Sequence, residues 1–583
     1  MNKSIYKLKA CTNQIDLVNS FHDNLNISIK EFWDIVYLKN TPSSFTKSSI
    51  PKSSGGERKL YIPPEPLKKL QKQFSKILLD CLIEIKKENP NYLICNHAFE
   101  PQKSIITNAK LHRNKKYILN IDLSDFFGSI HYGRVSNFFQ KDKHFQLNEK
   151  IAKTIAQLAC YRDVNNKTFL PQGSPLSPII ASLIGNLLDI RLVRIAKKYK
   201  LSYSRYADDI TFSSNGKIPE SLAKRDNKNS IWIIGEELEK EIEKSGFKIN
   251  HQKTRLFTPQ KQQTVTGIVV NKNLNVNNYY QKKNRAMLHK LFQTKKFFIG
   301  EHEGNINQLI GRLNHVASVK YLEQSIGMTE KEREEAKKEF SYLCARNFDN
   351  KPESNRSIRL LRQAIFYKYF ISNSKPIIIP EGITDTTYFR LANKILNNDN
   401  YKNNYQFQNL NSELTKIGLG GGTPQIKNFL TNSYRNHMID LKKLKFKSEH
   451  PAIFILDYDE GLAVDKKNIP EQFNMKNGEQ WTHIRENIYL VLLAPWLENS
   501  FKNPKKMVCV ENLIKSSNGI DISINDNNHN LVNFGTKELS KVKFSNYVVR
   551  HPQKFDFSGF SVLFDILEDI KQHYKDNVLS SFK

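Results

Sequence analysis

The sequence predicts a multidomain protein in which an α+β region is followed by an α/β region. The chain has 583 residues, whereas single hydrophobic cores stop growing at about 250–300 residues, so at least two domains are expected. Strand patterns at 117–122 and 202–213 and helical patterns between them predict the α+β region. Apolar runs at 376–380 and 452–456, separated by a helical pattern, are typical of buried parallel strands.

Helical segments are predicted at the N-terminus and near the middle of the chain. Up to about residue 40, Ile15, Val18 and Phe21 recur at helical spacing. Residues 329–338 predict a largely solvated helix, and residues 358–370 a more apolar one.

The run 202–213 predicts a β-hairpin with two adjacent acids at its tip. It alternates and is rich in β-branched and aromatic residues. Aspartate is poor in strands and costly to bury unpaired, so Asp208 and Asp209 at a tight turn are explained by a bound divalent cation. The alternative is a solvated turn that happens to hold two acids.

A third acid, Asp122, ends the apolar strand that begins at Tyr117. Phosphoryl transfer by two metal ions about 3.5–4 Å apart needs carboxylates that converge from separate strands. Asp122, Asp208 and Asp209 fit that need. The Gly- and Pro-containing loop 170–178 leads into an apolar helix, and it suits packing against a template and an incoming nucleotide.

The acid strand, the LPQG-type loop and the YxDD hairpin resemble, in this order, the palm of reverse transcriptases. The resemblance covers most of residues 50–315. It implies an RNA-directed DNA polymerase of fingers, palm and thumb that uses dNTPs and two Mg²⁺ ions. Phe127, five residues after the first acid, matches the residue that rejects a ribose 2′-hydroxyl.

The same resemblance assigns further nucleotide and template contacts. Gln172 and Gly173 match the loop that touches template and nucleotide. Lys253 matches a position near the triphosphate, and Arg58 resembles a fingers residue that grips phosphate. For these two cations an ordinary solvated side chain is the alternative.

Two short motifs narrow the resemblance to retron reverse transcriptases. The first is an NAxxH motif at 108–112 and the second a VTG motif at 265–267. Retron enzymes copy a structured noncoding RNA, starting from an internal guanosine 2′-hydroxyl, into branched, RNA-linked DNA (msDNA). The resemblance implies that RNA as a partner, contacted by Asn108, His112, Val265, Thr266 and Gly267. His112 has an alternative role as a structural residue that hydrogen-bonds the backbone.

A second set of acids follows the two apolar strands after residue 375. Glu381 and Asp385 come after the first strand, and Asp457 and Asp459 after the second. Acids at i and i+2 point to the same side where a strand frays. Open α/β folds place their sites at the carboxyl edge of the sheet, so we expect these acids to share a metal ion.

This order of acids resembles the TOPRIM domain of overcoming-lysogenization-defect type nucleases, over most of residues 375–583. In that family a further Glu and a Lys complete the site, and Glu511 and Lys541 are the matching positions. The resemblance implies a metal-dependent nuclease that uses Mg²⁺ or Mn²⁺ on a nucleic-acid target. A structural or decayed site is the alternative.

The predicted domains are fingers and palm with N-terminal helices at 1–318, a helical thumb or linker at 319–374, and the TOPRIM domain at 375–583. Such a fusion resembles retrons that act in bacterial antiphage defence, where the polymerase and its RNA–DNA product restrain an effector. Two alternatives stay open. In one, the TOPRIM half is a non-catalytic nucleic-acid-binding or assembly module. In the other, the polymerase copies diverse RNA without a dedicated partner.

Composition agrees with a nucleic-acid partner. A formal net charge of +31 attracts phosphate backbones, although a generally basic proteome is an alternative source of that charge. Six cysteines without CxxC spacing indicate a reducing compartment and no zinc site. No apolar run approaches the roughly 20 residues of a membrane helix, so we expect a bacterial cytoplasmic protein. A homo-oligomer is compatible with the sequence.

Overall fold

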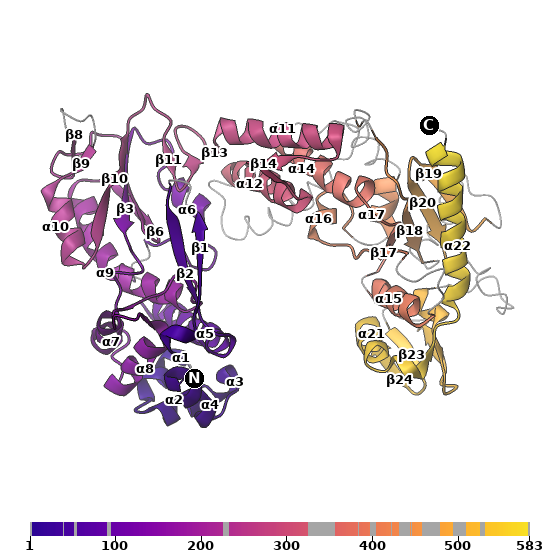
Figure 1. Ribbon diagram of the computed structural model, residues 1–583, viewed down its shortest axis with the longest axis horizontal. Helices are drawn as coiled ribbons and strands as arrows, with labels where there is room; N and C mark the ends of the chain where they lie inside the picture. Colours follow the sequence, from indigo (N-terminus) through magenta and orange to yellow (C-terminus); the bar gives the residue numbers. More distant parts are fainter. Residues whose placement is uncertain are drawn as a thin grey trace. The chain divides into compact units, whose positions relative to one another are not determined.

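The computed structural model divides into two compact units, Met1–Asn277 and Asn278–Lys583 (Figure 1). The predicted boundary at residue 318 falls inside helix α12 (Ile306–Gln324) of the second unit. The predicted helix at 329–338 and Asp459 lie outside the described residues. The structure describes residues 3–38, 40–51, 55–89, 92, 95–225, 232–324, 356–382, 384–396, 404–420, 423–430, 444, 446–457, 479–493, 509–524 and 531–580.

The first unit is built on an antiparallel sheet of strand order β10-β3-β7-β6. Its strands are β3 (Tyr117–Ser124), β6 (Ser202–Tyr206), β7 (Asp209–Ser214) and β10 (Lys248–Phe257). The predicted hairpin is therefore confirmed, with β6 and β7 joined at the two acids.

One face of this sheet is apolar and the other carries the polar residues, because strand side chains alternate between faces. On β3, Leu119, Ile121 and Leu123 are buried in the core. Asn120 and Asp122 therefore point to the opposite face. This alternation is what presents the first acid away from the core.

Helices cover the apolar face. The long helix α5 (Glu65–Glu88) buries Leu67, Leu70 and Phe74 at helical spacing in the same core as the sheet. The other helices of this unit are α1 (Ser4–Ala10), α2 (Gln14–Ser20), α3 (His22–Leu25), α4 (Ile29–Trp33), α6 (Ile105–Lys110), α7 (Tyr132–Lys141), α8 (Glu149–Ala159), α9 (Ser177–Lys198) and α10 (Glu236–Lys244).

Short strands complete the first unit. β1 pairs with β2, β4 with β5, and β8 with β9, while β12 lies between β11 and β13. Their bounds are β1 (Thr46–Pro51), β2 (Glu57–Ile62), β4 (Tyr161–Arg162), β5 (Thr168–Phe169), β8 (Ala223–Arg225), β9 (Trp232–Ile234), β11 (Thr264–Val265), β12 (Ile268–Val269) and β13 (Asn275–Val276).

The second unit begins with packed helices and continues into a sheet of order β17-β16-β18-β20-β19. Strands β17, β16, β18 and β20 run parallel, and β19 is antiparallel at the edge. The sheet strands are β16 (Ile377–Pro380), β17 (Gln406–Phe407), β18 (Ala452–Leu456), β19 (Trp481–Arg485) and β20 (Ile488–Leu492).

Both faces of this sheet are buried, as parallel sheets require. The consecutive residues Phe454 and Ile455 of β18 point to opposite faces of the sheet and belong to two separate cores. The helices of this unit are α11 (Asn278–Thr294), α12, α14 (Arg356–Phe366), α15 (Asp385–Ile395), α16 (Ser412–Thr415), α17 (Thr423–Asn428), α21 (Lys541–Arg550) and α22 (Phe560–His573). The predicted buried parallel strands are therefore confirmed.

The remaining strands of the second unit are short. β14 pairs with β15 and β21 with β25, while β23 lies between β22 and β24. Their bounds are β14 (Phe298–Ile299), β15 (His302–Glu303), β21 (Lys515–Ser516), β22 (Ile522–Ile524), β23 (Leu531–Phe534), β24 (Lys537–Ser540) and β25 (Phe555–Asp556). Within the described ranges, every helix is too short or too polar to cross a bilayer.

Candidate functional site

The three acids predicted for the first site meet at one end of the antiparallel sheet. Asp122 of β3 lies opposite Asp209 of β7 in the strand register. The backbone N–H of Leu123 donates to the Asp208 carbonyl at 3.0 Å, which ties the hairpin tip to β3. Ala207 has φ 55°, the left-handed conformation that makes this tight turn.

These carboxyl groups resist ionisation when no cation is present. Burial and the carboxylates of Asp208 and Asp122 raise the pKa of Asp209 to about 7. Burial also raises the pKa of Asp208, with a smaller contribution from Asp122. The Asp209 residue is nevertheless partly accessible to solvent, which screens part of the repulsion between the carboxylates. Acids that repel one another across a cleft are suited to a divalent cation, whose charge reverses the effect.

Asp122 already has two polar partners from β10. Lys253 Nζ lies 3.0 Å from Asp122 Oδ1, and Asn250 Nδ2 donates to Oδ2 at 3.1 Å. Asn250 lies directly opposite Asp122 in the register of β10 and β3. Lys253 is therefore a cation of the site rather than a remote solvated lysine.

A cleft of about 600 Å³ opens over the acids. It is lined by Arg58 of β2 and Lys253 of β10, which bring positive charge to the side facing Asp208. Apolar residues of β1 and of the loop after β3 line the rest. Six residues predicted from sequence thus share one cavity: Arg58, Asp122, Phe127, Gln172, Asp208 and Lys253.

Gly173 is required by the packing of its loop against β2. Its φ is +116°, and a Cβ there would lie 2.9 Å from the Tyr61 carbonyl oxygen. The Tyr61 N–H donates to the Gln172 carbonyl at 2.7 Å. The loop is thereby held with Gln172 at the cleft.

A buried ion pair between Arg205 and Asp189 contacts the turn of the acid hairpin. Arg205 is fully buried, and its Nε and Nη2 donate to the two carboxylate oxygens of Asp189 at 2.7 and 2.8 Å. Its Nη1 donates to the Ala207 carbonyl at 3.0 Å. A Cβ at Gly185 of α9 would lie 2.7 Å from Arg205 Nη2, so the pair needs glycine there. Arg205 is a positioning residue that sequence reasoning missed.

A second group of acids gathers at the carboxyl edge of the parallel sheet. Glu381 and Asp457 follow the neighbouring strands β16 and β18, and Asp385 begins α15. The Gly382 N–H donates to Asp385 Oδ2 at 2.7 Å, and the Val510 N–H donates to Asp457 Oδ1 at 3.2 Å. Four of the five predicted acids of this half therefore lie in described residues, and they come from one edge of the sheet and the segments beside it.

Lys541 supplies the positive charge of this second site. Its Nζ lies 3.2 Å from Glu511 Oε2, and Glu511 is 1% exposed. Burial alone would lower the pKa of Lys541, but the carboxylates of Glu511 and Asp457 raise it. Burial and Glu511 raise the pKa of Asp385 to about 6. Burial, Asp385 and Glu511 raise that of Asp457 well above its usual value.

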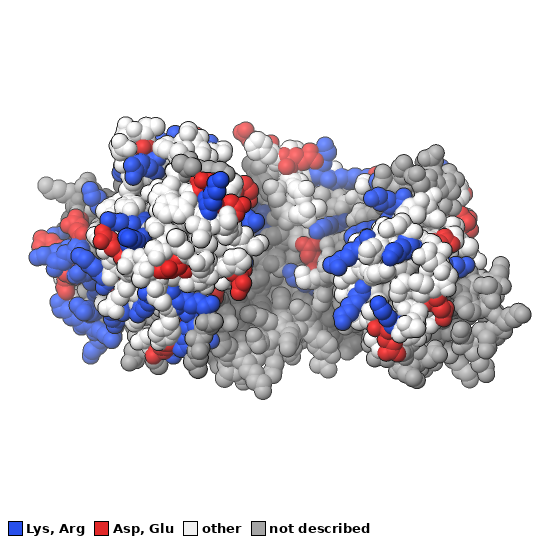
Figure 2. Space-filling model, turned by 90° about the horizontal axis from the view of Figure 1, so that it is seen from below, with Lys and Arg blue, Asp and Glu red and all other residues white. Residues whose placement is uncertain are grey.

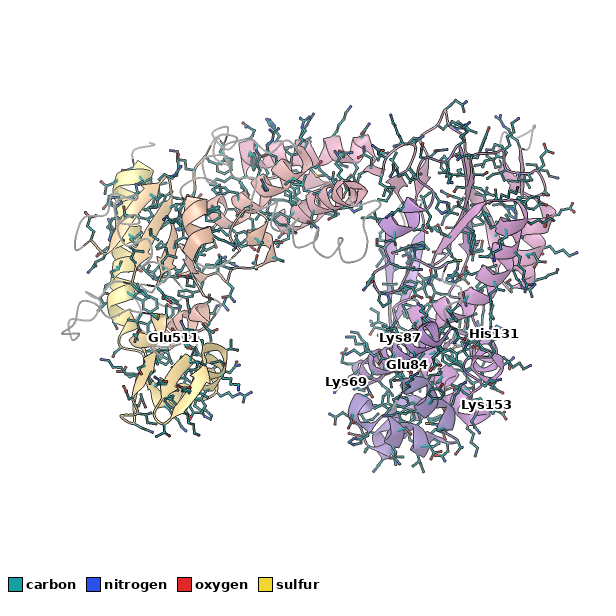
Figure 3. The ribbon with its side chains drawn as sticks, turned by 180° about the vertical axis from the view of Figure 1, so that it is seen from behind. Lys69, Glu84, Lys87, His131, Lys153 and Glu511 are labelled. Carbon is teal, nitrogen blue, oxygen red and sulfur yellow. The ribbon has the colours of Figure 1, made fainter. Side chains whose placement is uncertain are left out.

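Cys509 lies in the second site, although the sequence did not predict it as a site residue. Ligand atoms of Asp457, Cys509 and Glu511 all lie within 4.8 Å of one another, the sole such group of three among the described residues. The acids of the first site do not meet this spacing. Figure 3 labels Glu511 in the second unit.

Known proteins match the half of the chain that holds the first site. Residues 50–283 match a family model described as "Reverse transcriptase (RNA-dependent DNA polymerase)". The retron Ec86 reverse transcriptase of Escherichia coli is 32% identical over 263 residues, which cover 45% of this chain and 72% of that relative. The chain belongs to the retron reverse transcriptase family.

Other relatives of this retron reverse transcriptase align over a smaller part of their length. The retron Mx65 reverse transcriptase of Myxococcus xanthus is 29% identical, covering 49% of this chain and 64% of the relative. The retron Mx162 enzyme of the same organism is 28% identical, covering 44% and 54%. Among solved structures, Candida albicans telomerase with a fragment of telomeric RNA is 11% identical, covers 61% of this chain and 68% of its own, and has a TM-score of 0.30.

The retron motifs are placed inside the first unit. The His112 ring is fully buried and hydrogen-bonds Ser204 Oγ and Ser213 Oγ, each at 2.7 Å. Asn108 is buried too, and its Oδ1 accepts from Ser204 Oγ at 2.6 Å. His112 therefore fits the alternative role of a structural residue, although its partners are serine hydroxyls rather than backbone groups. Its ring is buried and offers no atom for direct contact with RNA.

The VTG motif packs against α6, the helix that carries Asn108. Val265 is buried, and Thr266 Oγ1 donates to the Ile105 carbonyl of α6 at 3.1 Å. Gly267 is exposed, with φ +80°. Of the five residues predicted to contact RNA, Gly267 is the one that is exposed.

Proposed function

We propose that the chain is the RNA-directed DNA polymerase of a retron, which copies a cognate noncoding RNA into branched msDNA, and that its second unit is a metal-dependent nuclease. The observation that carries the polymerase half is the single cleft over Asp122 and Asp208 that also holds Arg58, Phe127 and Lys253. Family membership supports the same activity.

The residues of the cleft have separable roles in this proposal. Asp122, Asp208 and Asp209 hold two Mg²⁺ ions, which supply activation of the primer hydroxyl and neutralisation of the leaving phosphate. The carboxylate donor set suits a hard cation. Arg58 and Lys253 bind the triphosphate.

In this proposal Phe127 selects deoxyribonucleotides over ribonucleotides. Phe127 lines the cleft and packs edge-to-face against two other rings. Its ring centroid lies 5.5 Å from that of Phe126 and 6.3 Å from that of Phe99. A ring held on two sides is a fixed wall, and a 2′-hydroxyl at that place would clash with it. The polymer made is therefore DNA.

Basic surface and a basic pocket support a nucleic-acid partner. Figure 2 shows, on the face in view, several clusters of Lys and Arg side chains on the first unit. In the second unit a cavity of about 200 Å³ between α11, α12 and α14 is lined by Lys282, Arg285, Lys320 and Arg356. We assign these helices the role of a thumb that holds the backbone of the template duplex.

The polymerase proposal is tested on the nucleic acid that copurifies with the protein. We would express the gene with its native upstream flank and run the bound nucleic acid on a denaturing gel before and after RNase. A short discrete DNA that shifts after RNase, is lost in Asp208→Asn and persists in the surface control Asp23→Asn supports the proposal. A smear of host sequences would contradict the dedicated RNA partner while leaving a reverse transcriptase.

The nuclease half rests on the buried acids and Lys541. Glu381, Asp385, Asp457 and Glu511 hold Mg²⁺ or Mn²⁺ in this proposal, and Lys541 stabilises charge that develops on a phosphate. The biological role that follows is an effector in antiphage defence, restrained by the polymerase and its msDNA. A non-catalytic assembly module is the second candidate, and the ion pair between the half-buried Lys541 and the buried Glu511 gives it a structural basis.

Cleavage by the full chain separates these two candidates. We expect Mg²⁺- or Mn²⁺-dependent cleavage of DNA or RNA that is retained in Asp208→Asn and lost in Glu381→Gln and Asp457→Asn. Cleavage that survives both changes would reject this site. Plaque counts on cells carrying the same variants then test the defence role.

A further inference from the structure

A thiol lies among the carboxylates of the second site. Cys509 Sγ, an Asp457 oxygen and a Glu511 oxygen are all within 4.8 Å of one another. The three residues are 2%, 6% and 1% exposed. Cysteine spacing along the chain predicted no zinc site, because that rule looks for cysteine pairs and here the partners are carboxylates from other segments.

Glu511 is buried without the hydrogen bonds that a carboxylate needs. Neither of its oxygens accepts a hydrogen bond from the described residues, although Lys541 Nζ lies 3.2 Å from one of them. Burying a charged carboxylate whose oxygens accept no hydrogen bond is costly, so the site favours a further cation at Glu511 in addition to Lys541. This observation is independent of the clustering itself.

The backbone around Cys509 and Glu511 is well defined. Both belong to one turn, since Cys509 caps the 3₁₀ helix Val510–Leu513. The Cys509 N–H donates to Asn512 Oδ1 at 2.8 Å, and the Val510 N–H donates to Asp457. Two ligands on one braced turn, with the third tied to that turn, need little reorganisation to close on an ion.

We propose that Asp457, Cys509 and Glu511 bind one thiophilic divalent cation, with Zn²⁺ favoured over Mg²⁺. A thiolate ligand selects zinc, whereas Mg²⁺ takes oxygen ligands and dehydrates reluctantly. Three protein ligands leave the fourth tetrahedral position of a zinc ion for a water molecule. Tetrahedral zinc ligands lie roughly 3.5 Å apart, so atoms already within 4.8 Å of one another need to close by no more than about 1 Å.

Lys541 lies beside the proposed ligands. Its ammonium group interacts electrostatically with Cys509 as well as with Glu511. A bound metal ion would share the charge compensation of Glu511 with Lys541. The thiol proton is released to solvent when the ion binds.

The regulatory consequence rests on the proposed nuclease. An ion held by Cys509 occupies the Asp457 and Glu511 oxygens that Mg²⁺ or Mn²⁺ would use. Zn²⁺ is then an inhibitor of cleavage whose binding depends on Cys509 as well as on the acids.

Cobalt titration of the purified full chain tests the ligand set directly. Co²⁺ substitutes for Zn²⁺, and a thiolate–Co²⁺ bond gives a near-ultraviolet charge-transfer band that carboxylate sites, including those of the polymerase cleft, do not give. We expect a band that saturates at one Co²⁺ per chain, is displaced by Zn²⁺, weakens in Glu511→Gln and is lost in Cys509→Ser. Cys95→Ser, in the first unit, is the matched control and keeps the band.

Each outcome decides the inference. A band that survives in Cys509→Ser, or no band in the wild type, overturns it. Unchanged thermal melting of Cys509→Ser without metal shows that loss of the band is loss of a ligand. If the band is absent but Mg²⁺-dependent cleavage is lost in Asp457→Asn, the nuclease stands and the zinc site is rejected. If the band is present but the wild type cleaves nothing, the zinc site stands and the nuclease is rejected.

Discussion

Arg205 and Asp189 form a bidentate buried ion pair next to the turn of the acid hairpin. Both side chains are almost fully buried, and the third nitrogen of the guanidinium holds the Ala207 carbonyl. The pair thus connects α9 to the turn that presents Asp208. The hairpin tip is strained into the left-handed region at Ala207, so a fixed donor there matters for where the acids point.

Breaking this pair should cost stability and catalysis together. Arg205→Met leaves Asp189 buried without its cation and with only the Tyr203 hydroxyl as a donor, and breaking a buried ion pair typically costs about 3–5 kcal/mol. Urea unfolding of the purified chain measures that loss. The double variant Arg205→Met with Asp189→Leu should recover part of it, because replacing both partners by apolar groups is often neutral, although the Tyr203 hydroxyl then loses its acceptor.

The double variant also separates positioning from stability. It still lacks the hydrogen bond to Ala207, so we expect kcat for primer extension to stay low while KM for dNTP changes little. Full recovery of kcat along with stability would show that Arg205 does not position the hairpin.

Removing one acid should abolish DNA synthesis without unfolding the protein. Asp208→Asn is nearly isosteric but removes a charged metal ligand, so primer extension should fall by orders of magnitude. Extension on a primed RNA template is the assay, and thermal melting checks the fold. Synthesis at the wild-type rate would overturn the palm assignment.

The aromatic wall predicts a change in sugar selectivity. Phe127→Ala opens the cleft next to the sugar, and we expect the ratio of kcat/KM for dNTP over rNTP to fall roughly 10- to 200-fold, the range for a steric pocket change. Phe99→Ala removes one of the two rings that hold Phe127 but does not itself open the cleft, so it should lower this ratio less than Phe127→Ala does. Equal selectivity in Phe127→Ala and the wild type would reject the gate.

Buried imidazoles predict that the fold loses stability as pH falls. Burial lowers the pKa of His112 to about 3. In the unfolded chain His titrates near 6.5, so between these values the unfolded state binds a proton that the folded state does not. The His112 contribution is complete above pH 6.5 and is lost as pH falls toward 3. From pH 7 to 5 this amounts to about 2 kcal/mol.

The comparison that isolates this effect is the pH dependence of unfolding in a variant. His112→Gln should flatten the fall in unfolding free energy between pH 7 and 5 by about 2 kcal/mol. His97→Gln should flatten it as well, since burial lowers the pKa of His97 to about 4. A slope equal to that of the wild type in both variants would mean that the rings are protonated in the folded state.

Local chemistry in the sequence determined the hairpin and its partner strand. Alternation with aromatic and β-branched residues identified β6 and β7, and the acid at the end of β3 identified the third carboxylate. These predictions succeeded because strand periodicity and turn chemistry act over a few residues. The buried parallel strands β16 and β18 were found in the same way.

Tertiary structure alone decided which distant side chains meet. Cys509 joins Asp457 and Glu511, and Arg205 reaches Asp189, through contacts between segments that no local pattern relates. It also decided the environment of His112: the NAxxH motif is a sequence signal, but burial against Ser204 and Ser213 depends on packing of α6 onto the hairpin. A residue type limits the chemistry that a side chain can perform, while burial and neighbouring charges, set by the whole fold, determine whether it is exposed, paired or ready to bind a metal ion.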